Sequence, residues 1–149
     1  MNRRLKQVAL GLVGLFVVAQ LVRPARANPP TDASRTIAAQ PGTSSELVTV
    51  LGRACGDCHS NATVWPSYTQ IAPLSWIMVA AVKEGRKAVN FSEWGTYPAE
   101  RQGQLLDASC AAVTAGKMPG SAWTWLHPEA QLSTQDVATI CAAAGARQP

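Results

Sequence analysis

The sequence predicts a small all-α domain that follows a hydrophobic N-terminal helix, and two observations carry this prediction. After residue 42, four segments repeat apolar residues three and four positions apart, and no convincing apolar–polar alternation typical of a β-strand appears. Before them, residues 8–22 form an apolar run that only Gln20 interrupts. The 149 residues leave room for one modest domain and a tail. We expect a targeting segment over 1–27, a linker over 28–42 and the domain over 43–149.

Residues 1–27 have the features of a targeting segment. Arg3, Arg4 and Lys6 precede the apolar run, and Ala25-Arg26-Ala27 offers small residues at the spacing that signal peptidase accepts. The run is shorter than the roughly 20 residues that cross a bilayer, which favours a cleaved signal peptide. The arginine and proline just before the alanines make a poor approach to a cleavage site, which favours a retained membrane anchor. Both alternatives stay open, and in both the basic end remains inside and the domain is exported.

The positive charge of the chain belongs to this segment. The formal net charge is +4, from 13 basic and 9 acidic residues. Five of the basic residues lie within 1–27, so eight remain against all nine acidic ones in the rest of the chain. That part has no run of Lys and Arg interleaved with aromatic residues, so we expect no nucleic-acid partner.

The first helix of the domain is predicted just after the linker. Residues 28–42 are rich in Pro, Ala and small polar residues and show no periodicity, as in a linker. The helix is predicted to begin at Thr43, where Thr43-Ser-Ser-Glu46 fits a capping box. Its apolar positions continue to Ala54, and it therefore delivers Cys55 at its C-terminal end.

Three further helices are predicted from their start and stop signals. Pro73 is placed to open the second helix, in which Gly85 weakens the helical pattern. Pro98 opens the third helix, and Gly116 sits where a glycine would end it. Residues 133–136 resemble a capping box at the start of the fourth helix.

The stretch Cys55-Gly-Asp-Cys58-His59 is the most specific motif in the chain. C-x-x-C-H is the attachment signature of c-type haem. Two cysteines three positions apart can each form a thioether to one vinyl group at the porphyrin edge, and the next histidine is held beneath the iron as its proximal ligand. Export favours this interpretation, because bacteria attach c-type haem outside the cytoplasm. We therefore expect one covalent haem c per chain, attached to Cys55 and Cys58 and ligated by His59.

Other interpretations of these cysteines are weaker but stay open. A redox-active dithiol should begin a helix that follows a β-strand, whereas this motif follows an amphipathic helix. A structural zinc site needs four ligands, and Cys110, Cys141 and His127 show neither paired spacing nor obvious convergence. Five residues can also match by chance. Cys110 and Cys141 are predicted either to form a disulfide, as an even pair in an exported protein, or to be buried small apolar residues.

The sixth ligand of the iron is predicted to be Met118. Met78 lies between apolar residues in a predicted helix, which indicates a core position. Met118 lies in a short loop between Gly116, which ends a helix, and Pro119, which stiffens the chain. His127 is a less favoured candidate and could instead bond a haem propionate or a backbone carbonyl. His/Met ligation occupies both faces of the iron and raises its potential relative to His/His ligation.

Tryptophan is unusually frequent for so small a domain, with five in the chain. These side chains can fill the core, or they can line a large flat apolar cofactor, because aromatic residues bring large buried area. For the lining role we single out Trp65, Trp76, Trp94 and Trp123. The candidates to pair with haem propionates are Arg53, Lys83, Arg86 and Lys87, with simple solvent exposure as the alternative.

Together these motifs resemble the small bacterial haem-binding domain family of exported or membrane-anchored monohaem c-type cytochromes. The likeness covers about residues 26–140 and rests on RANPP, CGDCHSNATVWPSYTQIAPLSW, EGRKAVNFSEW, KMP and LHPEAQLS. The resemblance implies a cytochrome c-like helical domain wrapped around one covalent haem. Cys55, Cys58 and His59 fall on the family's haem-binding signature, and Met118 falls on its Met-Pro element. The resemblance also favours a retained N-terminal anchor.

The function expected from these observations is electron transfer rather than enzymatic catalysis. A monohaem c-type cytochrome would cycle between Fe2+ and Fe3+ and exchange single electrons with redox partner proteins. We expect it on the periplasmic side of the inner membrane, anchored by its N-terminal helix or soluble after cleavage at Ala27. A haem-based sensor or gas-binding protein with a labile sixth ligand is the alternative. A peroxidase-like enzyme is disfavoured, since His127 is the one histidine left to act as acid or base.

Overall fold

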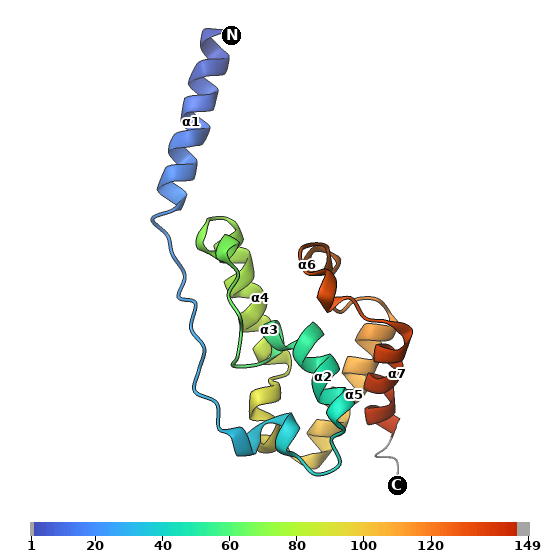
Figure 1. The fold of residues 1–149 in the computed structure, drawn as a ribbon. Coiled ribbons are helices and arrows are strands. Elements are labelled where there is room, and N and C mark those ends of the chain that lie inside the picture. Colours follow the sequence, from blue (N-terminus) through green and yellow to red (C-terminus); the bar gives the residue numbers. More distant parts are fainter. Residues whose placement is uncertain (1, 146–149) are drawn as a thin grey trace.

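The computed structural model describes residues 2–145, and every regular element in that range is a helix (Figure 1). This confirms the prediction of an all-α fold for these residues, and positions 146–149 of the expected domain lie outside them. The α-helices are α1 (Arg3–Ala19), α2 (Ser45–Ala54), α3 (Gly56–His59), α4 (Leu74–Ala88), α5 (Ala99–Thr114), α6 (Ser121–Leu126) and α7 (Thr134–Gly145). The 3-10 helices are η1 (Ala33–Arg35), η2 (Ile37–Ala39), η3 (Ser67–Gln70), η4 (Phe91–Thr96) and η5 (Pro128–Ala130).

The helices of the domain form a chain of pairwise contacts across the molecule. α4 packs on the short α3, α3 adjoins α2, and α2 packs on α7, which lies along α5 (Figure 1). Trp94 and Ile140 are almost completely buried at the centre of the core. The other members of this buried apolar cluster are Ile37, Leu47, Val50, Leu51, Val89, Phe91, Leu105, Leu106 and Val113. The core therefore draws on α2, η4, α5 and α7, and on Val89 directly after α4.

The start of α2 differs from the predicted capping box by one residue. Ser44, not Thr43, is the N-cap, and its hydroxyl accepts a hydrogen bond from the Leu47 amide at 3.1 Å. The carboxylate of Glu46 does not close a box, because it accepts instead from the hydroxyl of Thr139 on α7 at 3.0 Å. This tertiary contact outweighs the local motif and ties the first turn of α2 to α7. The predicted end of the helix is confirmed, with Cys55 as its C-cap.

The other predicted helix ends agree with the structure to within one residue, since Pro73 was predicted as the first helical residue and is the N-cap. Pro73 and Pro98 each occupy the N-cap and so directly precede the first helical residue of α4 and α5. The capping box of α7 is present, because the Ser133 amide donates to Asp136 Oδ2 at 2.8 Å and the Asp136 amide donates to Ser133 Oγ at 3.1 Å. Sequence patterns did not predict α6 or the 3-10 helices, which are too short to show a periodicity.

A glycine ends α5 and fixes the loop that follows. Gly116 has φ +63°, the left-handed conformation that glycine adopts without a steric penalty. Its amide donates to the Val113 carbonyl at 3.1 Å, and the Lys117 amide donates to the Ala112 carbonyl at 2.9 Å. These two bonds form a Schellman motif. The Met118 amide also donates to Ala112, at 3.3 Å, so this residue is held against the last turn of α5.

Residues 20–30, which we call the strap, run along the domain and are held by hydrogen bonds. At the start of the strap, the Ala72 amide donates to Gln20 Oε1 at 2.9 Å, and Trp76 Nε1 donates to the Val22 carbonyl at 2.8 Å. Farther along, the Arg86 guanidinium donates to the Ala27 carbonyl and to Asn28 Oδ1, both at 2.9 Å. The strap is therefore part of the packed structure.

The segment expected as a linker carries η1 and η2 and packs on the domain through η4. Ile37 on η2 is buried in the core. At the other end of the strap, α1 projects away from the domain (Figure 1). Among the helices of residues 2–145, none combines the length and the apolar character needed to cross a membrane.

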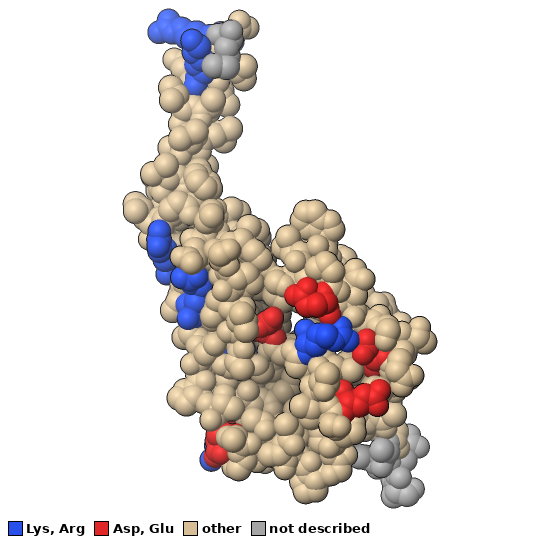
Figure 2. Space-filling view, viewed as in Figure 1, with Lys and Arg blue, Asp and Glu red and all other residues tan. Residues whose placement is uncertain are grey.

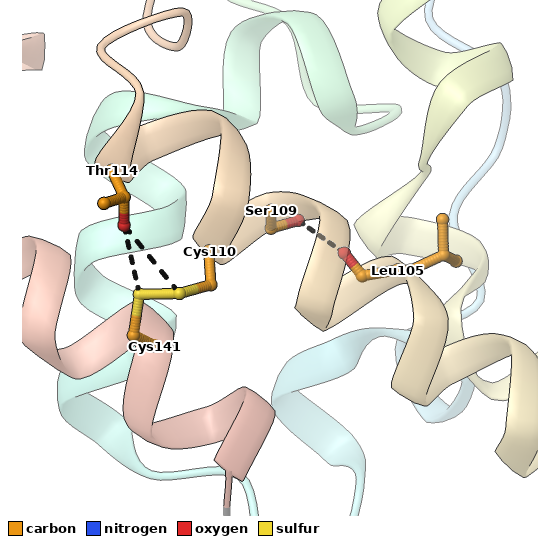
Figure 3. The surroundings of a disulfide bond; sticks show 5 residues. All are labelled: Leu105, Ser109, Cys110, Thr114 and Cys141. Atoms are coloured by element: carbon orange, nitrogen blue, oxygen red, sulfur yellow. Dashed lines mark hydrogen bonds between the residues drawn. A yellow bond between two sulfur atoms is a disulfide. The ribbon is translucent and has the colours of Figure 1, made fainter.

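A disulfide joins Cys110 near the end of α5 to Cys141 on α7, which settles the alternatives left open for this pair (Figure 3). The two Cα atoms are 4.7 Å apart, and the cysteines are separated by 31 positions in the sequence. Because it closes a long loop, the bond limits the freedom of the unfolded chain. It also fixes α5 to α7 close to the Schellman turn before Met118.

We expect the double variant Cys110→Ala/Cys141→Ala to lose about 3 to 4 kcal/mol of unfolding free energy, from the loop that the bond closes. Urea unfolding of both proteins, with and without reductant, measures the loss. Reductant should bring the native chain down to the stability of the variant and leave the variant unchanged. Equal stability of the native chain and the variant in the absence of reductant would contradict a stabilising role for the bond.

Candidate functional site

The imidazole of His59 is fixed by two backbone carbonyls of α4 and the residue after it. His59 Nδ1 lies 2.9 Å from the Gly85 carbonyl oxygen and 3.3 Å from that of Val89. Because a carbonyl can only accept, Nδ1 carries the proton and Nε2 keeps its lone pair. Burial lowers the pKa of His59, against the two hydrogen bonds, which raise it. The ring is therefore neutral near pH 7, with Nε2 in the form that binds a metal.

Gly85 is the position that lets α3 approach α4 so closely. A Cβ atom on Gly85 would lie 2.4 Å from the Cys58 carbonyl oxygen and 3.0 Å from its carbonyl carbon, both of them backbone atoms. No side-chain rotation relieves such a contact. The glycine that weakened the helix prediction is thus required by the packing of the motif, and a glycine inside a helical pattern was the signal for it.

Two neighbouring cavities lie next to the motif and share Cys55, His59 and Met118. The larger, of about 200 Å³, is mostly apolar, and its other lining residues are Leu51, Ala88, Val89, Phe91, Leu105, Ala108, Ser109, Ala112, Val113 and Ile140. The smaller, of about 70 Å³, is also lined by Ala54, Asp57, Cys58, Pro119, Gly120 and Trp123. The structure thus brings together the four residues singled out for attachment and ligation. Met118 lines both cavities and is 49% exposed to solvent.

Both motif cysteines are unpaired, and their thiols are held neutral. Burial, and next the nearby Cys58, raise the pKa of Cys55 to about 11. Burial, and next Asp57, raise the pKa of Cys58. A redox-active C-x-x-C has the opposite property, a lowered thiol pKa at a helix N-terminus. The electrostatics therefore disfavour the dithiol interpretation.

The four tryptophans proposed to line a cofactor do not gather at the site. Trp123 lines the smaller cavity. Trp94 is fully buried in the core, packed edge-on against Tyr97 with ring centroids 5.9 Å apart. Trp65 and Trp76 instead hydrogen-bond the strap, at Asn28 and Val22 respectively. Sequence could not separate these roles, because core, strap and cavity all favour aromatic side chains.

His127 belongs to a hydrogen-bonded cluster at the back of Trp123. Its ring stacks on the Trp123 indole with centroids 3.8 Å apart. Nε2 lies 2.8 Å from the Tyr68 hydroxyl and Nδ1 lies 3.0 Å from a Glu129 carboxylate oxygen. Both ring nitrogens are therefore engaged within the protein, which argues against His127 as a ligand. Nothing in the sequence pairs Tyr68 with His127, 59 positions away.

Two of the four basic residues considered as propionate partners, Arg53 and Arg86, form hydrogen bonds within the protein. Arg53 donates to the carbonyls of Glu129 and Gln131 and forms an ion pair of 2.9 Å with Asp136. Arg86 donates to the Ser60 carbonyl at 2.7 Å and to the Thr63 hydroxyl at 2.8 Å, besides its bonds to the strap. Lys87 lies 3.7 Å from Glu84 on the exposed surface of α4.

The donor set fits a c-type haem better than a structural zinc ion. Two neutral thiols, one imidazole with a free Nε2 and one thioether sulfur surround mostly apolar cavities. Thioether formation needs unpaired cysteines, and an imidazole with a thioether is a known pair of axial haem ligands. Cys110 and Cys141, which a four-ligand zinc site would have to recruit, are joined to each other.

In the comparison with protein families, residues 14–145 match the family described as Haem-binding domain. This match covers most of the chain. Comparison with curated proteins and comparison with solved structures give no significant match.

We expect Gly85→Ala to lower both stability and haem content. The added methyl group would collide with the Cys58 backbone and shift α3 from α4, at a cost of about 1 to 3 kcal/mol or more. Urea unfolding and the ratio of haem to protein absorbance measure the two effects. Gly103→Ala on α5 is the matched control, because its Cβ meets nothing within 4 Å. The control should keep its haem and gain up to about 1 kcal/mol; equal behaviour of the two variants would refute the packing argument.

The raised thiol pKa predicts how Cys55 reacts in the haem-free chain. Because burial favours the neutral thiol, alkylation in the folded chain should stay slow until the pH approaches about 11, whereas the unfolded thiol should follow its ordinary value of 9.0. Iodoacetamide labelling of Cys55, followed by mass spectrometry over a pH series with and without urea, measures both profiles. Superimposable profiles would contradict the shift.

Proposed function

The chain belongs to the haem-binding domain family, and on this basis we propose that it is a monohaem c-type cytochrome that carries single electrons in the periplasm. The observation that carries the proposal is the convergence of Cys55, His59 and Met118 on the same two cavities. Bound there, haem supplies an iron that gains and loses one electron. In this proposal the protein is an electron carrier and not an enzyme.

Each residue of the site has a distinct part in this proposal. Cys55 and Cys58 hold one covalent haem through thioethers, and the neutral thiols of the apoprotein are the groups that add to the vinyl carbons. His59 binds the iron through Nε2, because the Gly85 and Val89 carbonyls occupy Nδ1 and orient the ring. Met118 provides the sixth ligand. Phe91 and its apolar neighbours keep water from the site, which favours a ligated iron over a solvated one.

A sensor or gas-binding protein is the second candidate, and the exposure of Met118 favours it. A thioether that is 49% exposed has less packing to hold it than a buried one, so a diatomic ligand could displace it. The two candidates differ in one property, the strength of the sixth bond. A peroxidase-like role is less favoured, since the ring nitrogens of His127 are engaged by Tyr68 and Glu129.

We place the domain on the periplasmic side of the inner membrane, with its N-terminal segment retained as an anchor. Cleavage after Ala27 would remove the part of the strap that Ala72, Trp76 and Arg86 bind. A segment with so many specific contacts fits a retained part of the protein better than a discarded signal. The partners proposed are redox proteins that meet the domain at this membrane.

Met118→Leu tests the ligand and the function together. Loss of the thioether should lower the reduction potential, because methionine ligation raises it, and should open the iron to carbon monoxide. The holoprotein is made with cytochrome c maturation factors, reduced and exposed to the gas while haem absorption is followed. Met78→Leu on α4 is the control, a volume-conserving change at a buried methionine, and it should leave potential and spectrum unchanged.

The native protein discriminates between the two candidate functions in the same experiment. A spectrum that carbon monoxide does not change means that both iron faces are firmly occupied, as electron transfer requires. A prompt change means a labile sixth ligand, and the sensor would replace the carrier. Absence of covalent haem absorption would refute both.

A further inference from the structure

After the basic residues of its first turns, helix α1 is apolar on all sides from Val8 to Ala19, and none of its residues is buried by the rest of residues 2–145. From Leu5 to Val22, every large apolar side chain is at least 50% exposed. A helix that is hydrophobic all round needs an apolar environment around its whole circumference, whereas a groove on a partner protein covers one face. The lipid bilayer is the environment that fits this pattern.

The strap fixes the base of α1 to one particular end of the domain. Gln20 exchanges two hydrogen bonds with the backbone of Ala72, at 2.9 and 3.4 Å, and Trp76 donates to Val22. Both partners lie at the N-terminal start of α4. The environment of the last turn of α1 is therefore also the environment of residues 71–77, because these hydrogen bonds keep the two segments together.

This end of the domain carries exposed apolar side chains on segments that lack charge. Two basic residues of the strap lie beside it, because Arg26 donates to the Thr69 hydroxyl at 3.5 Å and Arg23 lines a pocket together with Trp76. We call it the apolar end and define it by Ile71, Leu74, Ile77, Trp125 and Leu126, which are 41–81% exposed. The sequence over 61–82 and over 118–128 contains no Lys, Arg, Asp or Glu. The start of α4 and α6 form the two parts of the domain nearest to α1 (Figure 1). Figure 2 shows the visible surface of both parts in tan, with basic side chains along the neighbouring strap and the acidic groups of the domain farther from α1.

We propose that the apolar end is a lipid-contacting surface that rests on the bilayer into which α1 inserts. The inference rests on the anchor proposed above and adds a second contact to it. Trp125 is 81% exposed and is the type of side chain that concentrates at membrane–water interfaces. Because α6 also carries Trp123, which lines the smaller cavity, the contact holds the Met118 side of the site close to the membrane surface.

Cross-linking from within the lipid tests this contact on the full-length holoprotein. The protein is placed, one chain per disc, in phosphatidylcholine nanodiscs that contain a lipid with a diazirine near its headgroup. After irradiation, digestion and mass spectrometry locate the lipid adducts. We expect adducts on α1 and on peptides that contain Leu74 and Trp125, several-fold above those on α2, which begins at the far end of the domain (Figure 1).

A pair of matched variants separates lipid contact from mere exposure. Trp125→Gln removes the most exposed apolar side chain of the apolar end, and adducts on α6 should fall several-fold. Val64→Gln changes a side chain that is 73% exposed but lies beside Leu51 and Gly56, and the adduct pattern should not change. Haem absorption of both variants reports that the domain is folded.

The possible adduct patterns distinguish failure of this inference from failure of the anchor. Adducts on α1 alone would overturn the lipid-contacting surface and leave the anchor in place. Absence of adducts from α1 as well would overturn both. In discs loaded with two chains, protein–protein cross-links through Trp125 in place of lipid adducts would assign the apolar end to a second copy of the chain.

Discussion

The contact between the Cys58 backbone and Gly85 is the one on which the candidate site depends. It brings α3 onto α4 without an intervening side chain, and only then does the Gly85 carbonyl come within 2.9 Å of His59 Nδ1. That hydrogen bond selects the tautomer, and burial keeps the ring neutral. The missing Cβ of Gly85 thus permits the close approach that places one of the two orienting carbonyls on the imidazole. The motif supplies the reactive groups, but α4 determines how they are presented.

The same turn of α4 also ties the site to the N-terminal strap. Arg86 follows Gly85 directly, and its guanidinium joins the Ser60 carbonyl just after the motif to Ala27 and Asn28. Burial lowers the pKa of Arg86, although a guanidinium stays charged at any ordinary pH. Its donors are satisfied mainly by neutral acceptors and by no ion pair within residues 2–145. Removing the strap would take away the two exposed hydrogen bonds to Ala27 and Asn28 and leave Arg86 with its bonds to Ser60 and Thr63.

Sequence reasoning predicted the helices well where start or stop signals coincide with apolar periodicity, as at Ser133 and Gly116. The predicted start at Thr43 was wrong by one residue. Glu46 accepts a hydrogen bond from Thr139 of α7, which is a tertiary contact that no local motif reveals. The attachment motif and Met118 were recognisable from their own short patterns. The residues that orient the two histidines were not recognisable from the sequence. Gly85 and Val89 contact His59 through backbone carbonyls, and Tyr68 contacts His127, which is distant in sequence. The chemistry of a side chain follows from the identity of one residue. Packing depends on which segments come together in the fold, and a local pattern does not show this.

Met118 has a backbone held by a hydrogen bond to α5 and a side chain that is half exposed to solvent. The Schellman turn holds its amide on α5, and the Cys110–Cys141 disulfide fixes that part of α5 to α7. The loop that carries the thioether therefore cannot move far from the cavities it lines. Its side chain, half exposed, has rotational freedom that a buried ligand lacks. If Met118 ligates the iron as proposed, this restraint of its backbone would make rebinding of a displaced sulfur fast, because the effective concentration of a tethered group stays high. In the proposed haem protein, such a site would favour a six-coordinate iron at equilibrium even where the bond to the sulfur is weak.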